Sequence, residues 1–447
     1  MNGFTSGSGA AAKTSLRLRS KDESDLIAKA KRFLPAGNTG NMASEIILRE
    51  GRGGRVWDES GNEYVDFLIG SGPMLVGHAH PEVTAAVQAQ VARGTTFFVN
   101  NRHGILLAEA IVDAVPCAEE VRFVSSGTET DIYAMRLARA FRKRDKILKF
   151  EGGYHGMGSY ALMSIFPKRV GNFPEPIPDS AGIPQRVRND VLVAPYNDIE
   201  TATGLIRKHK DELGGVIVEA FQRILPPVPG FLEGLRKVTA EHGIPLIFDE
   251  VVTGFRFAYG GAQEYYGVTP DICTLGKACG GGFPLAAIAG RADIMAHFDR
   301  AVVGDEGFLI QIGTLSGNPV AAAAGLATLA ILKRPGTYDR LFATGRELMG
   351  ELSEQLRRAS LPAQVVGAPP LFEAVFAEGD IRNYRDIQRA DAWLAKRFHE
   401  LLRERGIFKG ESKYYLSLAH TSDDVQFVRE AWASAIEQLV HEKKART

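Results

Sequence analysis

The chain has 447 residues, 45% of them hydrophobic and 24% charged, which is an ordinary composition for a folded protein with a large core. Its 53 basic and 53 acidic side chains cancel, so no net field would attract nucleic acid, anionic lipid or a strongly charged partner. We therefore expect a small-molecule substrate, with no nucleic-acid partner and no membrane partner.

Three cysteines, at positions 117, 273 and 279, are too few and too irregularly spaced for a disulfide framework or a zinc site. Their scarcity favours a reducing compartment, and we expect a cytoplasmic protein. The first twenty residues are rich in Gly, Ser, Ala and Thr. We expect residues 1–20 to be a disordered tail, with an organelle transit peptide as the alternative.

The first clear pattern along the chain is a β-hairpin. Strand-like runs at 54–57 and 64–68 flank the turn 59–62, whose sequence is Glu-Ser-Gly-Asn. We expect this hairpin to belong to a smaller second domain.

Between residues 121 and 290, short β-branched runs alternate with helix-like segments, which is typical of a mostly parallel sheet with helices on both faces. The predicted strands are 121–124, 147–150, 191–194, 215–218, 246–248 and 272–275. The proline-rich segment 157–188 has little periodicity, and we interpret it as a flap over the ligand site.

From residue 334 onward, amphipathic helices are predicted over 341–358, 389–406 and 423–442. We expect the two ends of the chain to build one small α+β domain. Its parts are residues 21–77 and 334–447, and the large domain between them is residues 78–333.

Ligands of open α/β sheets bind beyond the carboxyl ends of the strands, so chemistry is expected in the residues that follow the predicted strands. These residues are Ser126, Gly127, Thr128, Tyr154, His155, Glu219, Gln222, Asp249 and Lys277. Tyr154 and His155 offer a flat face on which a planar cofactor could stack, although simple packing explains them equally well.

The run from Ser125 to Thr130 lies between a predicted strand and a helix-like pattern. Free backbone N–H groups at such a turn bind anions, and Gly127 would let the backbone approach a phosphate closely. The same pattern is also typical of an ordinary helix N-cap.

Asp249 and Lys277 are charged residues that close otherwise apolar strands. A buried carboxylate needs a partner, which is either a structural cation or the protonated nitrogen of a pyridine ring. Most lysines are solvated, but Lys277, flanked by small residues at the end of a buried strand, is placed to lose its proton and attack an aldehyde. His78 and His80 lack a third ligand nearby, so we expect no metal site.

Together these segments resemble the class III aminotransferases of fold type I, which depend on pyridoxal 5′-phosphate, and most closely the glutamate-1-semialdehyde 2,1-aminomutase-like branch. The resemblance covers residues 28–439. Its motifs are Val56-Trp57-Asp58 through Asp66, Gly77-His78-Ala79-His80-Pro81, Ser126-Gly127-Thr128-Glu129, Gly153-Tyr154-His155-Gly156, Phe248-Asp249-Glu250-Val251, Thr274-Leu275-Gly276-Lys277 and Gly313-Thr314-Leu315-Ser316-Gly317-Asn318-Pro319.

The resemblance implies an α/β fold of a large domain, with a mostly parallel seven-stranded sheet, and a small α+β domain. It implies that Lys277 carries the cofactor as a Schiff base and then shuttles a proton, and that Asp249 pairs with the ring nitrogen. It also implies a homodimer with shared active sites. The other implied cofactor contacts are Ser126, Gly127, Thr128, Tyr154, His155, Glu219, Gln222, Val251 and, from the neighbouring subunit, Gly313 and Thr314.

Departures from the family pattern concern the substrate. The aminomutases hold their substrate carboxylate with an arginine near the N-terminus, but residues 35–43 contain none, and Ala43 stands near its place. Losing such a contact would cost roughly 1.5 to 3 kcal/mol. Arg223 lies in a stretch that normally faces the pocket in this family. The candidate substrate residues are Arg223, Met42 and Ser71. Arg256 could also receive a carboxylate, although structural pairing fits it better.

The sequence therefore predicts a transaminase that moves an amino group between an amine or non-α (omega or beta) amino acid and a keto acid such as pyruvate or 2-oxoglutarate. The alternative is an isomerase of the glutamate-1-semialdehyde 2,1-aminomutase type, which needs no second keto acid. A catalytically idle cofactor-binding protein on the same fold is a third reading, which the intact Lys277 and Asp249 disfavour.

Overall fold

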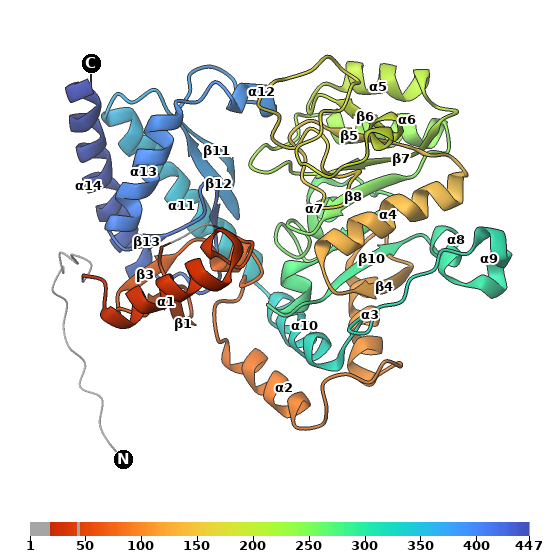
Figure 1. Ribbon diagram of the computed structural model, residues 1–447, viewed down its shortest axis with the longest axis horizontal. Helices are drawn as coiled ribbons and strands as arrows, with labels where there is room; N and C mark the ends of the chain where they lie inside the picture. Colours follow the sequence, from red (N-terminus) through yellow and green to blue (C-terminus); the bar gives the residue numbers. More distant parts are fainter. Residues whose placement is uncertain (1–17, 43–44, 447) are drawn as a thin grey trace.

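A computed structural model of the chain describes residues 18–42 and 45–446. Most of the expected N-terminal tail, residues 1–17, lies outside the described residues, and so does Ala43. The first described helix, α1 (Lys21–Phe33), begins after Ser20, whose side chain accepts a hydrogen bond from the backbone N–H of Glu23. Figure 1 shows one lobe that is formed by the middle of the chain and a second lobe that contains both its early and its late elements.

The large lobe is built on a seven-stranded sheet with the order β4-β10-β9-β8-β7-β5-β6. Its strands are β4 (Glu120–Val124), β5 (Lys146–Phe150), β6 (Val191–Ala194), β7 (Leu213–Val218), β8 (Leu246–Glu250), β9 (Ile272–Leu275) and β10 (Ala286–Gly290). Only β10 runs antiparallel to its neighbours. The expected mostly parallel seven-stranded sheet is confirmed.

Strand β10 was not among the predicted strands. Its sequence, Ala-Ala-Ile-Ala-Gly, has low intrinsic strand propensity, yet all five residues are buried between β4 and β9. Small side chains suit this position because helix α4 (Gly127–Arg142) packs directly on β10 and its neighbours. Tertiary packing therefore decides the structure of this segment.

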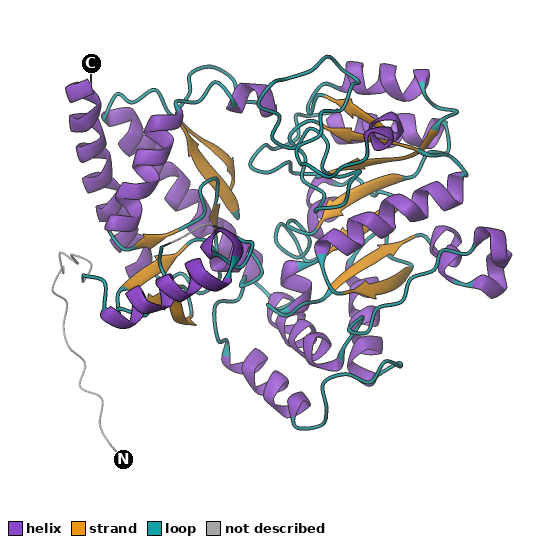
Figure 2. Ribbon diagram, in the orientation of Figure 1, coloured by secondary structure: helices purple, strands orange, loops and turns teal. Residues whose placement is uncertain are grey.

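Helices cover both faces of the large sheet (Figure 2). Besides α4, the helices of the large lobe are α2 (Pro81–Val91), α3 (Arg102–Ala114), α5 (Ile199–Lys208), α6 (Phe231–Glu241), α7 (Gly261–Tyr266), α8 (Ala292–Met295), α9 (Arg300–Gly307) and α10 (Pro319–Leu332), of which α2 and α9 lie away from the sheet. Short 3-10 helices are η1 (Pro35–Gly37), η2 (Ile69–Ser71), η3 (Gln185–Asp190), η4 (Lys277–Gly280) and η5 (Ala296–Phe298). Within the described part of the chain, no helix is both long and apolar enough to cross a membrane.

The small lobe joins the two ends of the chain. Its strands are β1 (Leu48–Arg52), β2 (Arg55–Asp58), β3 (Glu63–Asp66), β11 (Gln364–Ala368), β12 (Leu371–Val375), β13 (Ile407–Phe408) and β14 (Tyr414–Tyr415), and its helices are α11 (Thr337–Arg358), α12 (Tyr384–Ile387), α13 (Ala392–Glu404) and α14 (Ser422–Arg446). The predicted hairpin is confirmed as β2 and β3. Strand β13 pairs with β3 in parallel, with Ile407 opposite Val65. The exact domain boundaries stay a prediction.

The segment 157–188, expected to be a flap, is held by contacts at both of its faces. Lys149 is buried and donates hydrogen bonds to the carbonyl oxygens of Gly153, Ala161 and Met163. From the small lobe, Gln388 donates to the carbonyl oxygen of Pro167. The segment therefore bridges the two lobes beside the carboxyl ends of the strands.

Candidate active site

Lys277 follows β9 and opens the short helix η4 with a φ of +48°, a left-handed conformation that is costly for a lysine. Burial lowers the pKa of Lys277, and the nearby Asp249 carboxylate opposes that shift. Gly72 leaves room beside the lysine, because a Cβ atom at that position would lie 3.4 Å from Cδ of Lys277. Burial at this strand end therefore favours the neutral form of the Lys277 amine.

Asp249 is buried in β8, and its two oxygens are fixed from several directions. Oδ2 lies 2.8 Å from Nδ1 of His155, and Oδ1 accepts hydrogen bonds from the backbone N–H of Val251 at 3.1 Å and from the Thr274 hydroxyl at 3.4 Å. His155 is itself fully buried. This carboxylate therefore has a defined orientation.

A second carboxyl group, Asp131 on α4, lies beside Asp249. The Thr274 hydroxyl donates a hydrogen bond to Asp131 at 2.8 Å. Burial and then the negative charge of Asp249 raise the pKa of Asp131 well above its ordinary value. Burial and the neighbouring charge therefore favour a proton on Asp131. Sequence reasoning missed Asp131, which lies inside the helix and not at a strand end.

The turn at the start of α4 has the predicted form. Ser126 and Glu129 form a capping box, in which each side chain accepts a hydrogen bond from the other residue's backbone N–H. The N–H groups of Gly127 and Thr128 stand in the first turn, where no intrahelical acceptor exists. A Cβ atom at Gly127 would lie 2.9 Å from Cγ1 of Val251, so glycine is required for this close approach.

The turn after β5 packs on the same site. A Cβ atom at Gly156 would lie 2.6 Å from Cα of Thr128. The backbone N–H of Tyr154 donates a hydrogen bond to Glu219 at 3.1 Å, and the Gln222 amide donates to the carbonyl oxygen of Glu151 at 2.8 Å. The structure therefore brings the predicted residues from five strand ends to one place.

Two buried polar atoms in this place lack partners among the described residues, namely Nε2 of His155 and Oε1 of Gln222. Buried polar atoms without hydrogen bonds are costly, so a ligand that supplies them is expected. A positioned carboxylate, a lysine amine at a strand end, a helix N-terminus and two orphaned polar atoms fit pyridoxal phosphate, which presents a ring nitrogen, an aldehyde, a phosphate and a phenolic oxygen.

The two candidate arginines differ in their surroundings. Arg256 is buried, and its guanidinium donates hydrogen bonds to the carbonyl oxygens of Gly72, Pro370 and Leu416. Its role is structural, as expected. Arg223 is half-buried with a φ of +63°, and its guanidinium lies 5.5 Å from the Tyr154 ring centre and 5.7 Å from that of Phe166.

The other two substrate candidates have different neighbours. Ser71 shares a hydrogen bond with the Tyr415 hydroxyl, and Tyr415 lies against Gly72 next to Lys277. Met42 packs instead with a hydrophobic cluster that contains Val56. His78 pairs with Asp66 at 2.7 Å, and the described residues contain no cluster suited to a metal ion.

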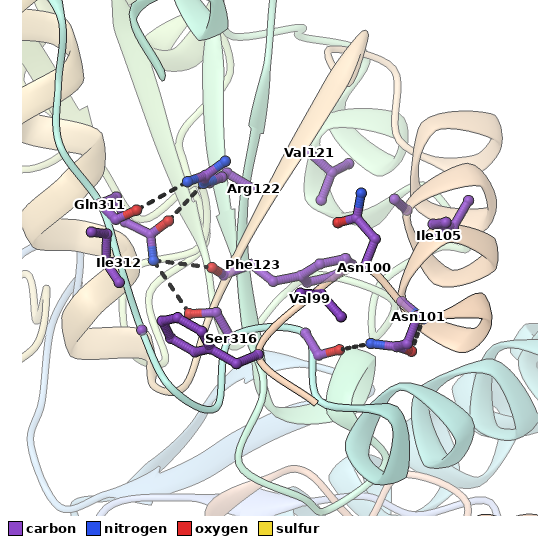
Figure 3. A pocket seen from close by; sticks show the side chains of 15 residues that line it. Val99, Asn100, Asn101, Ile105, Val121, Arg122, Phe123, Gln311, Ile312 and Ser316 are labelled. Atoms are coloured by element: carbon purple, nitrogen blue, oxygen red, sulfur yellow. Dashed lines mark hydrogen bonds between the residues drawn. The ribbon is translucent and has the colours of Figure 1, made fainter. Parts of the chain in front are cut away.

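Gly313 and Thr314 lie on a loop at the rim of a cavity of about 370 Å³, where α3, β4 and the segment 311–317 meet (Figure 3). Gln311 fixes this loop, because its side chain accepts a hydrogen bond from Arg122 at 2.6 Å and donates one to Ser316 at 3.3 Å. Thr314 is exposed. It does not cap the following helix, since Asn318 caps α10.

The chain belongs to the class III aminotransferases, because the family model described as "Aminotransferase class-III" matches residues 36–421. These enzymes use pyridoxal 5′-phosphate and act on small-molecule amines and keto acids, so the chain is a pyridoxal phosphate-dependent aminotransferase.

Solved structures of similar fold agree. An omega-transaminase from Sphaerobacter thermophilus is 36% identical, with 93% of this chain and 97% of that chain covered and a TM-score of 0.88. A β-phenylalanine aminotransferase from Variovorax paradoxus is 31% identical, with 93% of this chain and 94% of that chain covered and a TM-score of 0.83. A glutamate-1-semialdehyde aminomutase from Pseudomonas aeruginosa PAO1 is 24% identical, covers 94% of each chain and has a TM-score of 0.83, which shows the shared fold.

Proposed function

We propose that this enzyme is a transaminase that exchanges an amino group between an amine or non-α amino acid and a keto acid such as pyruvate or 2-oxoglutarate. Two observations support this. The chain is 36% identical to an omega-transaminase over nearly its whole length. In addition, described residues 35–42 lack the arginine that would hold an aminomutase substrate.

The cofactor roles are part of the same proposal. Lys277 holds the cofactor through its amine and then moves a proton at the reacting carbon of the substrate. Asp249 keeps the ring nitrogen protonated, and His155 keeps Asp249 in place. When bound, pyridoxal phosphate supplies an electron sink for the charge that develops at that carbon.

The remaining contacts surround the cofactor on three sides. The backbone N–H groups of Gly127 and Thr128 hold the phosphate at the positive end of α4, and the Ser126 capping box fixes that helix end. Val251 and Tyr154 face the two sides of the ring. Glu219 fixes the Tyr154 backbone, and Gln222 would lie near the phenolic oxygen of the cofactor.

A homodimer with shared active sites is also part of this proposal. The loop that carries Gly313 and Thr314 is surrounded by exposed apolar side chains. Val99 is 72% exposed and Ile312 is 70% exposed, and both line the cavity in Figure 3. A patch of this kind is typical of a protein contact, and a second copy would place Thr314 at the neighbouring phosphate.

The three free, buried cysteines fit a reducing compartment, so we also propose a cytoplasmic location.

The proposal is tested by adding single amines and β-amino acids to the purified holoenzyme without a keto acid. A transaminase converts its cofactor to the amine form with its donor, with loss of the visible absorbance and release of one ketone product. A keto acid then restores the absorbance. If no amine or amino acid changes the absorbance, the proposed reaction is wrong.

A further inference from the structure

Lys413 is a buried lysine whose ammonium has no acidic or hydrogen-bonding partner among the described residues. It lies just before β14 in the small lobe and is only 5% exposed. This ammonium lies over the Tyr415 ring, 5.7 Å from the ring centre. By contrast, Lys409 on the same loop is paired with Glu373 at 2.7 Å.

The surroundings of Lys413 are those of the active site. The charges of Arg223, Glu219, Lys277 and Arg256 all act on its ammonium. The Tyr415 ring next to it lies against Gly72, whose other neighbour is the Lys277 side chain. Lys413 in the small lobe and Arg223 in the large lobe therefore both lie close enough to the Lys277 amine for the charges to interact.

Arg223 also lacks an anionic partner in the described part of the chain, and its contacts are with the rings of Tyr154 and Phe166. Glu219 is the acidic residue that acts on Lys413, and it already accepts a hydrogen bond from the Tyr154 backbone. Arg223, Lys277 and Arg256 thus act on Lys413 as like charges, against the Glu219 carboxylate. Burial and then the charge of Arg223 hold the pKa of Lys413 well below its ordinary value, which shows how costly this arrangement is without an anion.

We propose that Lys413 and Arg223 together bind the carboxylate of the amino or keto substrate, one from each lobe. The proposal rests on the transaminase function above and names its substrate class, namely amines that carry a carboxylate. An anion between the two cations would supply both missing partners at once. Charge-assisted contacts of this kind change affinity by about ten- to hundredfold.

The first test compares 3-aminobutanoate with 3-aminobutanamide, which has the same skeleton without the charge. The rate constant for conversion of the cofactor by each compound is measured in the wild type, Lys413→Met, Lys413→Arg and Lys396→Met. We expect the wild type to react faster with the acid than with the amide. In Lys413→Met the rate constant for the acid should fall about ten- to hundredfold, and the rate constant for the amide should not change. Lys413→Arg should recover part of that loss, and Lys396→Met, which removes an exposed small-lobe lysine, should change nothing.

The second test needs no turnover. Binding of butanoate, an unreactive carboxylate, is measured by calorimetry, and Lys413→Met should weaken it by a similar factor. The melting temperature of Lys413→Met should equal or exceed that of the wild type, because an unpaired buried charge is removed. Equal losses on acid and amide, no loss on either, or unchanged butanoate binding would overturn the role of Lys413. If no amine at all converts the cofactor, the proposed function itself fails.

Discussion

Nδ1 of His155 lies 2.8 Å from Oδ2 of Asp249, and both side chains are buried at the carboxyl edge of the large sheet. This pair fixes one carboxylate oxygen, while Val251 and Thr274 fix the other. The opposite ring atom of His155, Nε2, has no partner among the described residues. Protein groups therefore orient the carboxylate, which is how a protein prepares a charge for catalysis.

Asparagine substitutions should separate the two neighbouring carboxyl groups. Asp249→Asn removes the charge, and we expect the variant to bind the cofactor but lose about a hundredfold or more in turnover. Asp131→Asn should stay within about threefold of the wild type, since an amide resembles a carboxyl group that is already protonated. Cofactor absorbance and steady-state rates check both results. Equal damage in the two variants would mean that Asp131 is also ionised.

Two buried lysines should respond in opposite ways to removal. Lys277→Ala should abolish turnover with little loss of stability, because burial already disfavours the charge on this amine. Lys149→Met leaves three backbone carbonyl oxygens without a donor and should cost at least about 2 kcal/mol of unfolding free energy. Denaturant unfolding and activity are measured on both proteins. Near wild-type turnover in Lys277→Ala would refute the assignment of the catalytic lysine.

The two candidate arginines offer a similar contrast. Arg223→Met should leave the melting temperature unchanged and raise KM for carboxylate-bearing substrates by about tenfold or more. Arg256 links the two lobes by hydrogen bonds to three backbone carbonyl oxygens. Arg256→Met removes this donor, so it should destabilise the protein by roughly 2 kcal/mol or more. Thermal unfolding and substrate titrations check both. An unchanged KM in Arg223→Met would exclude this residue from substrate binding.

Hybrid dimers test whether active sites are shared. Subunits carrying Lys277→Ala are mixed with subunits carrying Thr314→Ala, and the hybrids are purified by two affinity tags. One site of each hybrid then has both changes and the other has neither, so activity should exceed that of both parents. The activity of the hybrids should only equal the parental mean if Thr314 acts within its own subunit.

The sequence predicted those features that follow from the order of the strands. Asp249 and Lys277 could be found because each ends an apolar strand, and parallel strands bring such ends together. Strand β10 was missed because alanine has low strand propensity. Only packing between β4 and β9 makes this segment a strand. Lys413 was missed for a different reason. It lies on a short turn of the small lobe, and its closeness to Arg223 depends on how the two lobes pack, which no spacing along the chain reveals.

The fate of the amino nitrogen is the most direct test of the central claim. A donor labelled with ¹⁵N is incubated with the holoenzyme and unlabelled pyruvate or 2-oxoglutarate, and the products are examined by mass spectrometry. A transaminase should place the label in newly formed alanine or glutamate, with an equal amount of ketone from the donor. An amino group that only changes position within the labelled molecule, with no keto acid required, would contradict the account and identify an isomerase.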